Sequence, residues 1–192
     1  MVTADDIPVI IGWLRSRVSF ADSDLRPLLE RLFRVDFPRR AFLVSEGFAS
    51  GHVYFIEQGM IRCYWMVDGQ EITTSFSVEG SVVFSMDEVY YGTLSEEYVQ
   101  AIEPVVAYAL PIGDLHGLIS TSLLFARWWS VIHQDEYRRL HRSHKERLTL
   151  PARERYHAFA ESFPDVCRRA SLADIASYLG ITPSTMSRIR RP

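Results

Sequence analysis

The closing segment of the chain, residues 171–192, constrains the fold more than any other stretch. Two pairs of apolar residues recur at helical spacing, which gives each of two short helices one buried face. The apolar positions of the segment are Ile175, Leu179, Ile181, Met186 and Ile189. Gly180 favours a helix end because glycine adopts the left-handed conformation without strain, and Thr182 followed by Pro183 favours a new helix start. The segment is therefore predicted to form a helix-turn-helix.

The polar face of the second predicted helix indicates what this motif binds. If Met186 and Ile189 face the core, the opposite face carries hydroxyl and guanidinium groups, which bind base edges and phosphates in a major groove. Arg188 is expected to read a base, and Arg190 and Arg191 to contact phosphates. The candidate DNA-binding residues are Thr182, Ser184, Thr185, Ser187, Arg188, Arg190 and Arg191. The alternative is a helical pair that only packs or dimerises.

Charge is distributed unevenly along the chain. Residues 1–136 hold 9 basic against 19 acidic side chains, whereas residues 137–192 hold 12 basic against 5 acidic ones. An acidic body with a basic end is expected when that end meets a polyanion. A solvated basic helix would give the same count, so charge supports DNA binding without establishing it.

Residues 38–112 are predicted to form an antiparallel β roll. Short runs rich in Val, Ile, Tyr and Phe alternate there with glycine and proline turns, and Asp68-Gly69 is the strongest hairpin signal. Before the roll, "DSDLRPLLERLFRVDF" (residues 22–37) has the periodicity of a helix. Near the end of the chain, the segment from Pro164 to Ala170 is predicted to be a connection that leads into the helix-turn-helix. The fold class is α+β, with a jelly-roll-like β roll followed by helices.

A long helix is predicted between the roll and the closing motif. No proline occurs from residue 113 to residue 148, and the stretch "SLLFARWWSVIHQDEYRRLHRSHKERL" begins apolar almost all round. Such a helix must be covered on more than one side, by the roll and by the same helix of a second subunit. The candidate dimerisation residues are Phe125, Trp128, Trp129, Ile132, His133 and Leu140. The alternative is burial wholly within one subunit.

The order of parts resembles the Crp/Fnr family of transcription regulators. "HVYFIEQGMIRCYWMVDGQEIT" looks like the core strands of the family's cyclic-nucleotide-binding-type domain, and "DIASYLGITPSTMSRIR" looks like its helix-turn-helix. The resemblance implies N-terminal helices and a roll in residues 1–114, a dimerisation helix in 115–149 and a DNA-binding unit in 150–192. It also implies a homodimer on double-stranded DNA, a small-molecule effector of unknown identity and, as a further partner, RNA polymerase.

Two departures from the family pattern qualify this expectation. Family members that bind a cyclic nucleotide hold its ribose with Gly-Glu and its phosphate with Arg followed by Ser or Thr. Phe84 and Ser85 stand in place of the first pair, and Ser95 and Glu96 in place of the second. Because carboxylates repel phosphate, we expect no cyclic AMP binding in the usual mode, as in effector-orphan members. No β-hairpin wing is expected after the second helix.

Composition argues against several other classes. Two cysteines, Cys63 and Cys167, lie far apart without a partner motif, which disfavours a disulfide framework, a zinc site or an iron–sulfur cluster. No stretch has the ~18 uncharged apolar residues of a membrane span, and the N-terminus lacks the features of a signal peptide. A cytoplasmic protein without membrane partners is expected.

No catalytic residues, metal ligands or cofactors are predicted. A cupin-like metal site would need a second histidine near His52, in addition to Glu57, and none is present. His141 and His144 are one helical turn apart but have no third ligand nearby. No nucleophile–base arrangement and no glycine-rich phosphate loop is visible. The protein is therefore not expected to be an enzyme.

A sensory module with vestigial DNA binding is the alternative function. Strand aromatics could line a ligand pocket in the roll, although such residues belong to a core more often. These aromatics are Tyr64, Trp65, Tyr90 and Tyr91. Arg62 and Arg127 could approach the roll, but a surface or helix-anchoring position is the favoured interpretation for each.

Overall fold

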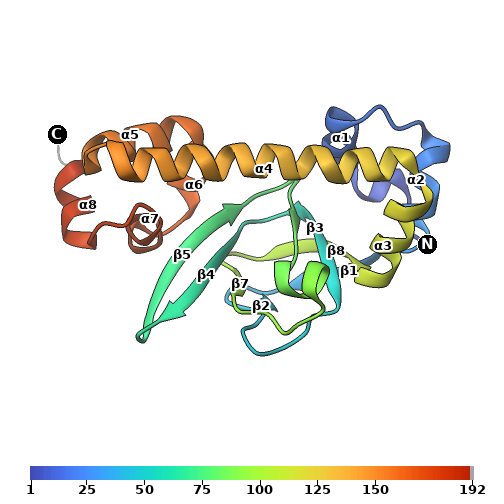
Figure 1. Cartoon of the computed structure of the whole chain (residues 1–192), viewed down its shortest axis with the longest axis horizontal. Coiled ribbons are helices and arrows are strands. Elements are labelled where there is room, and N and C mark those ends of the chain that lie inside the picture. Colours follow the sequence, from blue (N-terminus) through green and yellow to red (C-terminus); the bar gives the residue numbers. More distant parts are fainter. Residues whose placement is uncertain (191–192) are drawn as a thin grey trace.

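The computed structural model describes residues 1–190 and contains a β roll beneath one long helix (Figure 1). A 3-10 turn, Ala4–Asp6, precedes the first two helices, α1 (Pro8–Arg17) and α2 (Asp22–Leu29). The strands of the roll are β1 (Phe33–Phe37), β2 (Phe42–Val44), β3 (His52–Gln58), β4 (Ile61–Val67), β5 (Gln70–Ser77), β6 (Val82–Val83), β7 (Tyr98–Ala101) and β8 (Val105–Pro111). The later helices are α3 (Ile112–Thr121), α4 (Leu123–Thr149), α5 (Ala152–Ser162), α6 (Pro164–Arg169), α7 (Leu172–Tyr178) and α8 (Pro183–Arg190).

The roll consists of two antiparallel four-stranded sheets, which confirms the α+β fold class. Their strand orders are β1-β8-β3-β6 and β2-β7-β4-β5. In the first sheet Tyr54 of β3 lies opposite Ala109 of β8, and in the second Cys63 of β4 lies opposite Val99 of β7. The predicted hairpin is confirmed between β4 and β5, where Asp68 and Gly69 both have positive φ, 49° and 75°.

The segment before the roll differs from its prediction. Helix α2 ends at Leu29 instead of continuing to Phe37, and residues Phe33–Phe37 form strand β1. Phe33, Val35 and Phe37 alternate along this strand, which pairs with β8. Strand pairing with the sheet therefore overrides the helical spacing of the upstream leucines. A five-residue π-helix at Asp87–Tyr91 was also not predicted.

The expected long helix is confirmed as α4, and residues 115–121 of the range 115–149 belong to the separate helix α3. Helix α3 ends at Thr121, and α4 begins at Leu123 after Ser122, whose backbone is extended with φ −126° and ψ 118°. The Ser122 hydroxyl accepts a hydrogen bond from the Phe125 amide at 3.5 Å and caps α4. Helix α4 then runs along the whole length of the molecule, from the N-terminal helices to the C-terminal ones (Figure 1).

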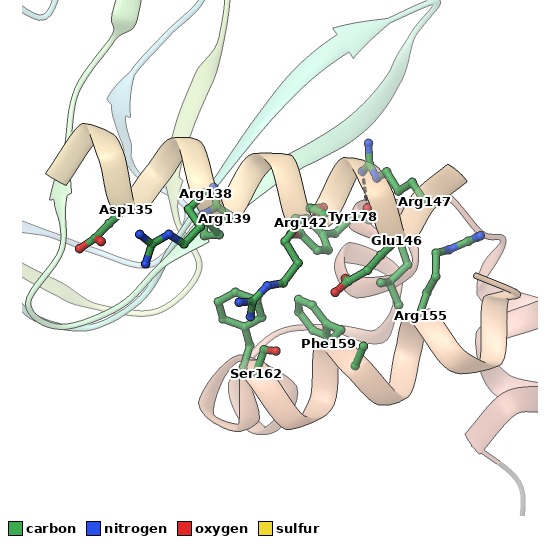
Figure 2. A pocket seen from close by; sticks show the side chains of 14 residues that line it. Asp135, Arg138, Arg139, Arg142, Glu146, Arg147, Arg155, Phe159, Ser162 and Tyr178 are labelled. Carbon is green, nitrogen blue, oxygen red and sulfur yellow. Dashed lines mark hydrogen bonds between the residues drawn. The ribbon is translucent and has the colours of Figure 1, made fainter. Parts of the chain in front are cut away.

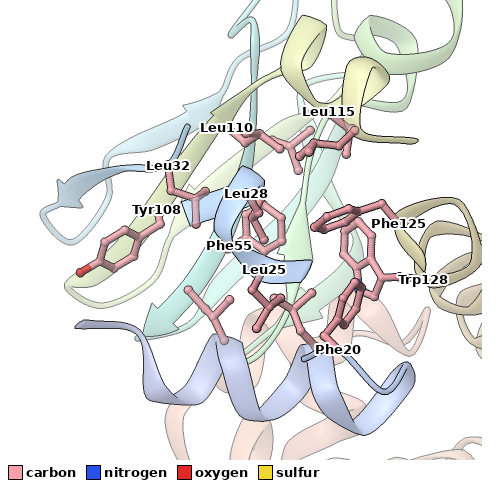
Figure 3. Close-up of a cluster of buried hydrophobic side chains, with 14 of the residues drawn as sticks. Phe20, Leu25, Leu28, Leu32, Phe55, Tyr108, Leu110, Leu115, Phe125 and Trp128 are labelled. Atoms are coloured by element: carbon pink, nitrogen blue, oxygen red, sulfur yellow. The ribbon is translucent and has the colours of Figure 1, made fainter. Parts of the chain in front are cut away.

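One face of the first half of α4 is buried inside its own subunit, and this corrects the predicted dimer contacts of Phe125, Trp128 and Ile132. Phe125 and Trp128 are 2% and 1% exposed, and Ile132 is buried beside them. They pack with α1, α2 and the roll in one large apolar cluster (Figure 3). The Trp128 ring stacks on Phe55 with centroids 6.0 Å apart. These three side chains are covered by their own chain, so they are unavailable to a second subunit.

The C-terminal helices form a smaller cluster against the roll. The buried members are Met60, Phe159, Val166, Ile175, Ala176, Tyr178, Leu179 and Met186. The predicted connection from Pro164 to Ala170 is instead the short helix α6, because Pro164 occupies its first turn and Val166 packs into this cluster. Across residues 1–190, no helix combines the length and the apolar character needed to cross a membrane.

Candidate nucleic-acid interface

Helix α7 is fixed by a cap at its start and a glycine at its end. The Ser171 hydroxyl accepts a hydrogen bond from the Asp174 amide at 3.1 Å. Gly180 has φ +65°, the left-handed conformation that ends the helix and turns the chain toward α8. Ile175 and Leu179 are buried, as the sequence predicted.

Helix α8 presents its polar side chains to solvent. Pro183 is its first residue, and the Thr182 hydroxyl accepts a hydrogen bond from the Thr185 amide at 3.2 Å. Met186 is fully buried, which orients the helix and leaves the opposite face free. The predicted DNA-binding residues that are exposed are Thr182, Ser184, Ser187, Arg188 and Arg190.

Two of the predicted DNA-binding residues need separate comment. Thr185 is only half-buried, and its hydroxyl accepts a hydrogen bond from the Arg188 guanidinium at 3.2 Å. Thr185 therefore positions Arg188 as well as lying next to the exposed face. Arg191 lies outside the described residues.

An ion-pair network joins α7 to the roll. Arg62 on β4 forms ion pairs with Asp174 of α7 and Glu71 of β5, and its side chain is only 6% exposed. The Ser177 hydroxyl accepts from the Thr73 amide and donates to the Glu71 carbonyl, both at 2.9 Å. Arg62 was expected to take either a surface position or a helix-anchoring position, and in the structure it anchors helix α7.

A second ion-pair cluster lies one helix earlier. Arg169 at the end of α6 pairs with Glu79, at 2.8 Å, and with Glu103. The two carboxylates raise the pKa of the Arg169 guanidinium further above its ordinary value, because they accept its hydrogen bonds, Glu79 with the larger effect and Glu103 with the smaller. Sequence reasoning did not find these contacts, since the partners are distant in the chain and follow no local spacing.

The segment of the roll around Ser95 is acidic. Ser95 is buried, and its hydroxyl donates to the Glu97 carbonyl at 3.0 Å. The Glu96 amide donates to the Asp87 carboxylate at 2.9 Å. Burial, together with the nearby Asp87 charge, raises the pKa of Glu97 to about 7. The carboxyl groups of Asp87 and Glu97 thus lie near Ser95.

Aromatic side chains connect this region to α4. Phe84 lies 5.1 Å from Trp129 between ring centroids, and the Tyr90 hydroxyl is hydrogen-bonded to His133. Trp129 and His133, two of the predicted dimerisation residues, are therefore half-buried against their own roll. The pKa of the Tyr90 hydroxyl is raised to about 12, mainly by burial. Tyr90 and Tyr91 are both exposed in part, whereas Tyr64 is buried.

The second half of α4 is exposed. Tyr137 and Leu140 are 72% and 50% exposed, and they follow His133 at the four- and three-residue steps of a single helix face. Of the predicted dimerisation residues, Leu140 is thus the most accessible. Within residues 1–190, no group of three or more His, Cys, Asp or Glu side chains is arranged to hold a metal ion.

Comparisons with known proteins agree with this architecture. Residues 34–122 match the family model of the cyclic nucleotide-binding domain. A comparison with curated protein sequences finds no match. FixK2 from Bradyrhizobium japonicum has a similar structure, with a TM-score of 0.70 and 21% identity over 82% of this chain and 82% of that chain.

Two further solved structures share the fold. The c-di-GMP responsive global regulator CLP from Xanthomonas campestris has a TM-score of 0.67 and 16% identity, over 88% of this chain and 89% of its own. A Eubacterium rectale protein named for the crp/fnr family of transcriptional regulators has a TM-score of 0.71 and 13% identity, over 88% and 82%. The chain therefore contains a match to the cyclic nucleotide-binding domain and shares its overall fold with regulators of the Crp/Fnr type.

Proposed function

We propose that this protein is a dimeric, DNA-binding transcription regulator of the Crp/Fnr type. The observation that carries the proposal is the surface of α8: hydroxyls and arginines are exposed on one face, while Met186 is fully buried on the other. A capped helix with this polar face suits entry into a major groove by its N-terminal half. Arg188 would pair with two acceptors of a guanine, and Arg190 would contact phosphate.

The proposed dimer interface is the exposed half of α4. His133, Tyr137, Leu140 and His144 follow one another at alternating four- and three-residue steps, the spacing of a coiled-coil seam. Leu140 and Tyr137 are exposed in the subunit, so pairing would remove apolar surface from water. Pairing of two α4 helices would place two copies of α8 for successive major grooves.

The effector of the roll is proposed to be something other than cyclic AMP bound in the usual mode. Ser95, Glu96 and Glu97 supply no cation for the phosphate of a cyclic nucleotide. Glu97 instead places a partly buried carboxyl group there, and burial raises its pKa. The structural neighbour CLP is described as c-di-GMP responsive, which shows that this fold is used with other ligands. In a thermal melt, cyclic AMP should leave the transition temperature unchanged, and a saturable increase would overturn this part of the proposal.

Selection of bound sequences from a random duplex pool, at two salt concentrations, tests the DNA-binding proposal. A palindrome with half-sites about one helical turn apart is the expected result for a dimer. Arg188→Ala should lose the preference among sequences while the dimer persists, and Arg26→Ala, far away on α2, should behave as wild type. If no sequence is enriched, and the protein retains duplex DNA only weakly and in a salt-sensitive way, a sensory module with vestigial DNA binding is the better description of the protein.

A further inference from the structure

A groove rich in arginine lies between the second half of α4 and helix α5. Figure 2 shows Arg142 and Glu146 on α4 pointing toward Phe159 and Ser162 on α5, with Arg138 one turn earlier on α4. The end of α7 closes the groove with Tyr178 and Leu179. Its volume is about 210 Å³, about two-thirds of the ~300 Å³ at which typical ligand pockets begin. The groove therefore suits a small ligand.

The positive charge in the groove exceeds the negative charge. The lining arginines are Arg138, Arg139, Arg142, Arg147 and Arg155, against Asp135 and Glu146. Asp135 is already paired with Arg17 of α1, at 3.4 Å, and Arg139 with Glu136 at 2.8 Å. Arg138 and Arg142 make no ion pair with any residue in 1–190. Two guanidinium groups are thus available to an anion.

Arg155 lines the groove from α5 but is held by its own chain. Its Nη1 atom donates to the Leu150 carbonyl at 3.0 Å, which fixes the guanidinium at the base of α5. Its Nε atom is buried without a hydrogen-bond partner among the described residues, so a ligand in the groove does not reach that atom.

The remaining wall of the groove is apolar. Phe159 and Leu179 are buried there, and Phe163 lies next to them. Arg147 is held over the ring of Tyr178, with its guanidinium carbon 5.7 Å from the ring centroid, and donates to the Tyr178 carbonyl. Arginines on one side and aromatic rings on the other suit a ligand that combines a phosphate with an apolar or planar part.

Most of the α4 side chains in the groove lie opposite the proposed dimer seam. Asp135, Arg138, Arg142 and Glu146 line the groove, whereas Tyr137 and Leu140 belong to the seam. Since each residue advances about 100° around a helix, these two sets are roughly half a turn apart. Arg147 also lines the groove and lies next to Leu140 around the helix, so dimerisation through the seam would leave open the side of the groove that carries Arg138 and Arg142.

We propose that this groove binds a phosphorylated small molecule. Arg138 and Arg142 would hold the phosphate, and the aromatic wall would cover the rest of the ligand. The inference goes beyond the proposed function, whose DNA surface is α8 and whose effector region is the roll. Arg138 and Arg142 are exposed on α4, so duplex DNA is the competing ligand that the test must separate from a small molecule.

Binding is tested on the full chain without DNA, so that its outcome is independent of the DNA-binding proposal. Pyrophosphate and AMP are titrated calorimetrically, with adenosine and sulfate at equal ionic strength as controls. Saturable binding of pyrophosphate or AMP, but not of adenosine or sulfate, is the expected result. Arg142→Gln should weaken that binding at least about tenfold, the loss of one charge-assisted hydrogen-bonding group.

Arg127→Gln is the matched control, because Arg127 is exposed on the same helix and does not line the groove. It should bind the probes as wild type does. The proposal is overturned if neither phosphate probe binds, or if Arg142→Gln and Arg127→Gln bind them equally. It is also overturned if Arg142→Gln weakens retention on duplex DNA while pyrophosphate binding is unchanged, since the groove would then belong to the DNA surface.

Discussion

The two ends of the molecule are attached to the β roll by different chemistry. At the N-terminal end, α1, α2 and the first half of α4 meet the roll through one large apolar cluster that includes Phe55 and Trp128. At the C-terminal end, α7 meets the roll through a smaller apolar cluster together with ion pairs and hydrogen bonds, chief among them Arg62 with Asp174. The first interface excludes water, whereas the second depends on charge.

This difference indicates which end is able to move. Apolar burial is non-directional and insensitive to salt, so the N-terminal interface behaves as part of one core. Ion pairs need defined geometry, and a competing charge or a lost partner removes them. We therefore expect the C-terminal helices to detach from the roll before the N-terminal helices do, and the predictions below test that order.

Trp128→Ala should have the largest effect. The side chain is 1% exposed between Phe55 and Trp13, so its truncation leaves a cavity and should cost about 3–5 kcal/mol of unfolding free energy. Urea denaturation measures the loss. Leu140→Ala on the exposed half of α4 is the control, and an equal loss in both variants would contradict the contrast between the two halves.

Asp174→Ala should release the C-terminal helices. It leaves the buried Arg62 guanidinium with Glu71 alone, which should cost about 3 kcal/mol locally. Hydrogen exchange should then quicken in residues 152–190 and stay slow in β3 and β8. Asp165→Ala breaks an exposed pair with Arg168 and should change exchange little. Uniform acceleration across the chain would show that the C-terminal end is not a separate unit.

Glu97→Gln should remove a pH dependence of the unfolding free energy that arises in the roll. Burial and the Asp87 charge raise the pKa of Glu97 to about 7, so between about pH 4.5 and 7 the folded state binds a proton that the unfolded chain has released. The stability of the native protein therefore falls as pH rises through this window. At pH 8 the variant should be more stable by up to about 3 kcal/mol, and at pH 4 the difference should vanish.

The measurement is urea denaturation at a series of pH values, and Glu96→Gln, which changes an exposed neighbour, is the control. If wild type and Glu97→Gln show the same pH profile, the Glu97 carboxyl is not buried in the folded protein. The profile should also be unchanged by Asp174→Ala, since the roll and the C-terminal interface are separate.

Thr182→Ala should have the smallest effect. It removes the oxygen that accepts from the Thr185 amide and should cost about 1 kcal/mol, confined to α8. Thr182→Ser keeps that acceptor and should behave as wild type. Exchange of the α8 amides measures the difference, and a change that extended into α1 would contradict the independence of the two ends.

Local features of the fold were predictable from sequence, and partners across the fold were not. The two terminal helices and the Asp68-Gly69 turn follow from short-range conformational preferences, so they were found correctly. The periodicity of Phe125 and Trp128 shows that a face is buried but not what covers it. Helix α1 covers that face, and the spacing of apolar residues does not distinguish a cover from the same chain from a cover by a second subunit.

The candidate site shows the same division. The exposed face of α8 could be read from the spacing of Met186, because one buried position fixes the orientation of a short helix. The Arg62–Asp174 pair joins residues more than a hundred positions apart, and the arginine groove is assembled from α4, α5 and α7. Such sites depend on tertiary contacts that one sequence does not encode by pattern.

Because α4 contacts the roll near one end, a small tilt of the helix at that contact would move its other end much further. Trp129 rests on Phe84, and the helix extends from there to Thr149 without interruption. That span is about 20 residues, or ~30 Å, so a tilt of about 5° at Trp129 would move the far end by about 2.6 Å. If α8 enters a groove of DNA as proposed, a displacement of that size would change how well it fits. A side-chain rearrangement at Phe84 that tilted α4 would therefore be magnified at the opposite end of the molecule.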